Sequence, residues 1–133
     1  MGAWGLGAFE NDDAMDWAIA FQHAPSEQAV RDALQAVIGV EDYIERDPGS
    51  HALAAAEVVA ATNGRPCRDI PPLLRDWAVP NGKIATSELV ALALAAVERV
   101  TVAESSEVAE LWADSPEAAA WAVRMDDLRQ RLR

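Results

Sequence analysis

The 133-residue sequence predicts an all-α protein, a compact bundle of about five main helices with short helical turns between them. Helix start and stop signals recur along the whole chain. Alanine, the strongest helix former, supplies 28 of the residues. No segment shows the alternation of β-branched and aromatic residues, bounded by hairpin turns, that predicts strands. The length suits one domain, so we expect residues 1–133 to fold as a single unit.

Capping residues predict the first two helices. Asn11 precedes an acidic first turn, and Pro25 ends the helix that follows. Ser26 caps the second helix. Gly39 is expected at the C′ position of that helix, where a left-handed backbone favours glycine.

The next segment predicts a short turn and then the central helix. Residues 40–46 (VEDYIER) are expected to form a helical turn that packs Tyr43 and Ile44. Asp47-Pro48 then reads as an N-cap followed by proline at the first helical position. The helix that follows is apolar on almost every side (ALAAAEVVAA) and ends at Asn63-Gly64. Such a helix is typically the buried, central one.

Loop and cap signals organise the second half of the chain. Residues 65–72 contain three prolines and predict an extended loop. Residues 73–79 predict one or two helical turns, and residues 80–82 (PNG) a turn. Hydroxyl caps predict the starts of the remaining helices: Thr86 or Ser87 for a long helix, Ser105 or Ser106 for a short one, and Ser115-Pro116-Glu117 for the last.

The charge is strongly negative and unevenly distributed. The net charge is −11, and residues 1–63 carry 11 acids against two arginines. Because this charge repels phosphate groups, we expect neither nucleic acid nor a membrane surface as a partner. A basic protein partner is compatible with it. The chain also lacks a signal-peptide pattern and an apolar run of about 20 residues, so we expect a cytoplasmic location.

The most informative segment is the first 17 residues, MGAWGLGAFENDDAMDW. Glycines at positions 2, 5 and 7 predict a strap that folds closely over the core, anchored by Trp4 and Phe9. Their order, G-x-x-G-x-G with no preceding strand, does not match a dinucleotide-binding loop. We also expect Trp4 to be partly exposed, as a candidate for contacting a ligand or partner.

Polar residues follow the strap, namely Glu10, Asn11, Asp12, Asp13 and Asp16. One interpretation is structural, since acids in a first helical turn are favoured by the helix dipole. The other is a site for a cation or a partner, because Asp12 and Asp16 fall on one helix face. The spacing does not match a calcium-binding loop, and we predict no cofactor and no metal-ligand set.

Glu57 is the one charged residue in the predicted central helix after its first turns. A buried carboxylate either has a raised pKa, as in a general acid, or is paired with a cation or a helix N-terminus. No second catalytic group can be named, so we predict a paired, structural glutamate. We assign no catalytic residue.

Cys67 and the tryptophans complete the candidates. Cys67 lies beside Arg68, whose positive charge could lower the pKa of the thiol. His23 and His51 have no motif around them. Of the five tryptophans, we expect those at positions 17, 77 and 121 to fill the core.

These motifs resemble the bacterial "domain of unknown function 4259" family. The N-terminal segment is the most specific part, and ALAAAEVVAATNGRP, SELVALALAAVERV and WAVRMDDLRQRL extend the resemblance along the whole chain. The resemblance implies a small cytoplasmic stand-alone protein. The family name states no activity, so no catalytic residue is transferred.

Three functions remain open from the sequence. The favoured one is a non-enzymatic acidic interaction module that binds, and in one version neutralises, a basic protein. The second is a metal-binding protein or small enzyme that uses the N-terminal acids. The third is an oligomeric scaffold, in which helix faces of several copies pair.

Overall fold

The computed structural model describes residues 5–133 and confirms the all-α prediction. The described residues form seven α-helices and two 3-10 helices, and β-pairing among them is limited to an isolated bridge. The α-helices are α1 (Asp12–His23), α2 (Glu27–Ile38), α3 (Arg46–Thr62), α4 (Pro72–Ala78), α5 (Ser87–Val100), α6 (Glu107–Ala113) and α7 (Ala118–Leu132); the 3-10 helices are η1 (Val79–Ile84) and η2 (Ala103–Ser105).

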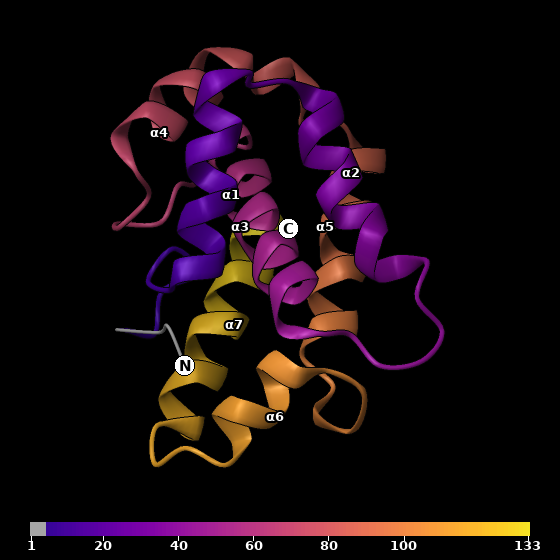
Figure 1. Cartoon of the computed structure of the whole chain (residues 1–133). Coiled ribbons are helices and arrows are strands. Elements are labelled where there is room, and N and C mark those ends of the chain that lie inside the picture. Colours follow the sequence, from indigo (N-terminus) through magenta and orange to yellow (C-terminus); the bar gives the residue numbers. More distant parts are fainter. Residues whose placement is uncertain (1–4) are drawn as a thin grey trace.

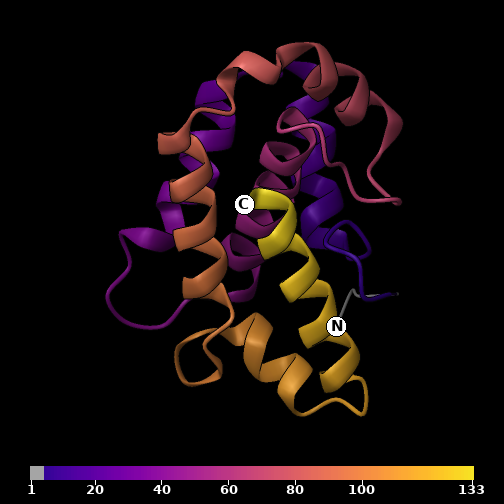
Figure 2. The same cartoon turned by 180° about the vertical axis from the view of Figure 1, so that it is seen from behind.

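Helix α3 lies at the centre of the bundle, as its apolar sequence predicts. Each of the other six α-helices contacts it. Helices α1 and α2 flank α3 in Figure 1, and α5 and α7 cover it in the reverse view of Figure 2. Of its 17 residues, 13 are buried, and many of these are alanines. Small side chains allow helix backbones to approach closely, which explains how one helix can contact six others.

The predicted caps of four helices are confirmed. Asn11, Ser26, Thr86 and Ser106 are the N-cap residues of α1, α2, α5 and α6, and each side chain accepts a backbone N–H of the first turn. These bonds satisfy donors that a helix cannot satisfy internally. Local sequence was sufficient here because donor and acceptor are three residues apart.

The prediction of a helical turn over residues 40–46 is wrong. Residues 40–45 form an irregular loop with a bend at residues 41–42, Arg46 already belongs to α3, and Ile44 forms a parallel bridge with Ser106. Ile44 N–H donates to the Ser105 carbonyl at 2.9 Å, and Glu107 N–H donates to the Ile44 carbonyl at 2.8 Å. The Arg99 guanidinium also donates to the carbonyls of Val40 and Asp42. Partners far away in sequence therefore replace the local bonds of a helical turn.

Helix α3 begins two residues earlier than predicted, at Arg46 instead of Pro48. Its N-cap is Glu45, whose side chain makes no capping bond. Instead, Arg46 N–H donates to Glu107 Oε1 at 2.9 Å, so that a side chain of α6 caps α3. Helix α7 conversely begins later than Ser115-Pro116 predicts, since Glu117 is its N-cap and residues 115–117 form a turn before it. Residues 79–84 form η1 where a simple turn was predicted.

The two helix-ending glycines differ from one another. Gly39 has a φ of −75° and is the C-cap of α2, so the left-handed C′ conformation predicted for it is wrong. After Gly39 the chain leads to Ile44, which forms the bridge with Ser106. Gly64 has a φ of +82° and occupies the C′ position of α3. Gly64 N–H donates to Ala61 and Arg65 N–H to Ala60, which is the Schellman arrangement.

We expect Gly64→Ala to lower the free energy of unfolding by about 1 kcal/mol, the cost of a left-handed backbone for a residue with a Cβ. A Cβ at this position would meet no atom within 4 Å, so steric overlap contributes nothing. Urea unfolding measures the effect. Gly39→Ala is the control, because its backbone is right-handed and the nearest atom would lie 3.5 Å from the Cβ. An equal loss in both variants would contradict this explanation.

Tyr43, the one tyrosine of the chain, provides a pH-dependent probe of the loop. Its hydroxyl donates to Glu110 Oε2 at 2.6 Å, and this bond raises the pKa of Tyr43 to about 12. Because the folded-state pKa is raised, the stabilisation is complete below the unfolded value of about 10 and is lost as the pH rises toward 12. Ultraviolet absorbance of the phenolate measures the titration. We expect Glu110→Gln to lower the midpoint; an unchanged midpoint would exclude this bond as the cause.

Candidate functional site

The glycine strap of the opening segment folds around the Glu10 side chain. Gly7 N–H donates to Glu10 Oε1 at 3.0 Å, and Glu10 N–H donates to the Gly7 carbonyl at 3.0 Å. A Cβ on Gly5 would overlap the Glu10 carboxylate and one on Gly7 would overlap the carboxylates of Asp69 and Glu10, so a side chain at either position would displace these groups. Phe9, with 2% of its surface exposed, anchors the strap in the core. Trp4, the other predicted anchor, lies outside the described residues.

The remaining polar residues of this segment have separate surroundings. Asn11 Oδ1 accepts Ala14 N–H at 2.8 Å as the cap of α1. Asp13 forms an ion pair with Arg46 at 2.8 Å. Asp12 and Asp16 are exposed on α1. Across residues 5–133, no three His, Cys, Asp or Glu side chains are grouped so that they could hold a metal ion.

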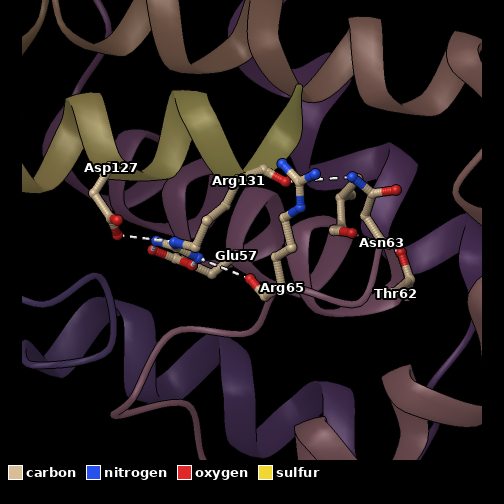
Figure 3. A network of polar contacts seen from close by, with 7 residues as sticks. Glu57, Thr62, Asn63, Arg65, Asp127 and Arg131 are labelled. Carbon is tan, nitrogen blue, oxygen red and sulfur yellow. Dashed lines mark hydrogen bonds and ion pairs between the residues drawn. The ribbon is translucent and has the colours of Figure 1, made fainter.

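Glu57 is the centre of a buried polar network (Figure 3). Only 4% of the residue is exposed, and Arg131 of α7 binds its carboxylate with two bonds, Nη1 to Oε1 at 2.7 Å and Nη2 to Oε2 at 3.0 Å. Arg131 Nε also binds Asp127 at 2.8 Å. Burial acts to lower the pKa of Arg131, but the bonds with Glu57 and Asp127 outweigh it and raise the pKa. The guanidinium therefore keeps its charge beside Glu57.

The left-handed turn at Gly64 completes this network. It directs the Arg65 carbonyl toward Arg131, whose Nη1 donates to it at 3.2 Å. Arg65 Nη1 in turn donates to the Gln130 carbonyl at 3.1 Å, and Asn63 Nδ2 donates to the Arg131 carbonyl at 3.3 Å. These bonds satisfy carbonyls of the last turn of α7. The C-terminal ends of α3 and α7 are thus joined by side chains of both helices.

A cleft of about 540 Å³ adjoins the network. Its lining includes Glu10, Glu57, Cys67, Asp69 and Arg131. Burial and the nearby carboxylates of Glu57 and Asp69 raise the pKa of the Cys67 thiol. The expectation that Arg68 lowers this pKa is therefore wrong, and the thiol is protonated at neutral pH. A protonated thiol is a poor nucleophile. Neither histidine lines the cleft.

The tryptophans pack mainly as aromatic pairs at the edge of the core. Trp121 is buried and stacks on the half-buried Trp112, with 6.2 Å between ring centroids. Trp17 and Trp77 are half-buried rather than fully enclosed, and both contact Phe21. Trp17 and Trp77 were expected in the core, but both lie at its rim.

The α2–α3 loop meets the start of α6 in the lower half of Figure 1, and both segments are rich in acidic residues. The Ile44–Ser106 bridge brings the two segments together. Three large apolar side chains are exposed nearby in sequence, with exposed fractions of 40% for Ile38, 42% for Tyr43 and 45% for Val102. We call this surface the acidic end, and define it by its carboxylates: Glu41, Asp42, Glu45, Asp47, Glu104, Glu107 and Glu110.

The sequence contains no local signal that Arg131 is the partner of Glu57, or that the residues of the acidic end share one surface. A lone glutamate in an apolar helix signals that a cation is needed. It does not say which of the 11 lysines and arginines supplies it, and Arg131 is 74 residues away. The acidic end depends on pairing between residues 44 and 106, for which the sequence has no local pattern.

This geometry defines a class of protein: an all-α domain that is built around one buried helix and has an acidic surface at one end. The chain belongs to the family described as Domain of unknown function (DUF4259), whose match covers residues 2–124. No curated protein and no solved structure matches the chain. Among the described helices, none has the length and apolar character needed to cross a membrane.

We expect Glu57→Ala to lower the free energy of unfolding by about 3 kcal/mol, because it leaves the charge of Arg131 buried without its main partner. Urea unfolding at neutral pH measures the loss. Asp127→Asn is the control: the Asp127 side chain is 59% exposed, so its loss should cost under about 1 kcal/mol. The double variant Glu57→Met, Arg131→Met should be more stable than Glu57→Ala. Equal stability of Glu57→Ala and the natural chain would contradict the network's structural role.

Proposed function

We propose that this protein is a non-enzymatic interaction module whose acidic end binds a basic protein partner. The observation that supports the proposal is the distribution of charge. Seven of the 22 acids form ion pairs within residues 5–133, and four arginines supply all seven pairs. The excess of negative charge therefore remains on the surface, where it attracts a positively charged partner.

The acidic end is where this excess is most concentrated. It carries seven carboxylates, six of them on exposed residues, and two arginines lie beside it: Arg46 donates its backbone N–H to Glu107, and the Arg99 guanidinium donates to the Ser105 carbonyl. Arg46 is engaged by Asp13, and Arg99 by backbone carbonyls. The exposed Ile38, Tyr43 and Val102 add apolar area near the charges. Protein interfaces combine such a charged rim with apolar and aromatic contacts.

We expect a lysine- and arginine-rich peptide to bind the full chain, with an affinity that falls as salt is added. Neutralising three acids of the acidic end (Glu41→Gln, Asp42→Asn, Glu45→Gln) should weaken binding about tenfold, because each surface charge contributes up to about 1 kcal/mol. Isothermal titration calorimetry measures both effects.

The control neutralises three exposed acids elsewhere, Asp12, Asp16 and Asp76, each to Asn. It changes the net charge by the same amount, and we expect less than about threefold weakening. Equal weakening in both variants would show that binding follows net charge alone and would overturn the acidic end as the binding surface. Stronger weakening in the control would instead favour the N-terminal acids.

A further inference from the structure

A groove with a volume of about 370 Å³ lies between α1, α2 and the first turns of α3. Trp17 of α1 and Pro48 of α3 form walls, and Asp32 of α2 and His51 of α3 add polar groups. Three alanines of α2, at positions 29, 33 and 36, also line it. Their spacing places them on one helix face, and their small side chains leave the space open. The groove is thus apolar with one carboxylate and one imidazole at its surface.

Trp17 is held in a defined orientation. Its ring stacks on Phe21 with centroids 5.0 Å apart and an interplanar angle of 20°. Phe21 is itself fixed by an edge contact with Trp77 at 5.2 Å. Because Trp17 is half-buried and lines the groove, it offers indole surface there without reorganisation. A preordered indole is the best aromatic partner for a cation.

Asp32 adds a negative charge to the groove that Trp17 lines, so that both side chains would favour a bound cation. Gln28 Nε2 donates to Asp32 Oδ1 at 2.8 Å, which orients the carboxylate. Among residues 5–133 no lysine or arginine forms an ion pair with Asp32, unlike Glu27 on the same helix, which pairs with Arg31. One carboxylate of the acidic end, Asp47, directly precedes Pro48, which lines the groove.

We propose that this groove binds an arginine side chain of the basic partner, with the guanidinium stacked on Trp17 and hydrogen-bonded to Asp32. A planar guanidinium suits both contacts, because it stacks on aromatic rings and donates in parallel to a carboxylate. The aliphatic part of the side chain would cover the alanines of α2. This inference rests on the proposed function, and it names the chemical group through which the acidic protein recognises its partner.

The experiment uses the full chain and two blocked tripeptides, acetyl-Gly-Arg-Gly-amide and the same peptide with citrulline. Citrulline has the shape of arginine without its charge. Nuclear magnetic resonance follows the indole N–H signal of Trp17, assigned by its absence in Trp17→Phe, at about pH 8, where histidine is ordinarily neutral. We expect the arginine peptide to shift this signal in a saturable way and the citrulline peptide to leave it unchanged.

Asp32→Asn should weaken arginine binding about tenfold, and Asp76→Asn, an equal change on exposed α4, should leave it unchanged. The proposed arginine site would be wrong if the arginine peptide bound Asp32→Asn as tightly as the natural chain. It would also be wrong if the citrulline peptide bound as tightly as the arginine peptide, or if the Trp17 signal showed no saturable shift. Asp32 is exposed, so the variant should fold, and circular dichroism checks this. If the groove proposal fails but the acidic-end variant still weakens binding of the lysine- and arginine-rich peptide, the proposed function stands. Failure of the groove and failure of the proposed function can therefore be told apart.

Discussion

The burial of α3 on every side is the constraint on which the rest of the structure depends. A helix of small residues can be surrounded by six others, but each neighbour must then meet its surface closely. Glu57 is the charged group inside this environment, and a buried carboxylate without a cation would cost several kcal/mol. The two bonds from Arg131 remove that cost and fix where the end of α7 lies. The turn at Gly64 serves the same contact, because it presents the Arg65 carbonyl to the same guanidinium.

The surface is strongly acidic because acids outnumber bases and several arginines are already engaged. Several arginines make contacts that join parts of the fold. Arg131 neutralises Glu57, Arg46 links α3 to Asp13 of α1, and Arg99 donates to carbonyls of the α2–α3 loop. With 11 basic residues for 22 acids, few positive charges remain to balance the exposed carboxylates. The strongly acidic surface therefore follows from this imbalance of acids over bases, and it is the feature on which the proposed binding of a basic partner rests.

The N-terminal segment, which carries the family resemblance, has mainly structural contacts in the part that the structure describes. Gly5 and Gly7 make room for Glu10, Asn11 caps α1, and Asp13 pairs with Arg46. Its outward-facing residues are Asp12 and Asp16, while Trp17 turns toward the groove beside α2. A segment can thus be specific to a family because its backbone fold demands particular residues. The groove and the acidic end, on which the two proposals rest, are formed mainly by other segments of the chain.

The sequence alone determined the all-α class, the central position of α3 and the caps at Asn11 and Ser26, because each depends on residues within one helical turn or on one helix face. It left two candidates for each of two later caps, of which the structure selects Thr86 and Ser106. It also identified Glu57 as a carboxylate needing a partner. Tertiary structure decided which cation that partner is, why residues 40–45 form a loop instead of a helical turn, and where α3 begins. It also decided that Trp17 and Asp32 line one groove and that seven carboxylates form one end. These features join residues distant in sequence, and their energies appear only once the helices have packed.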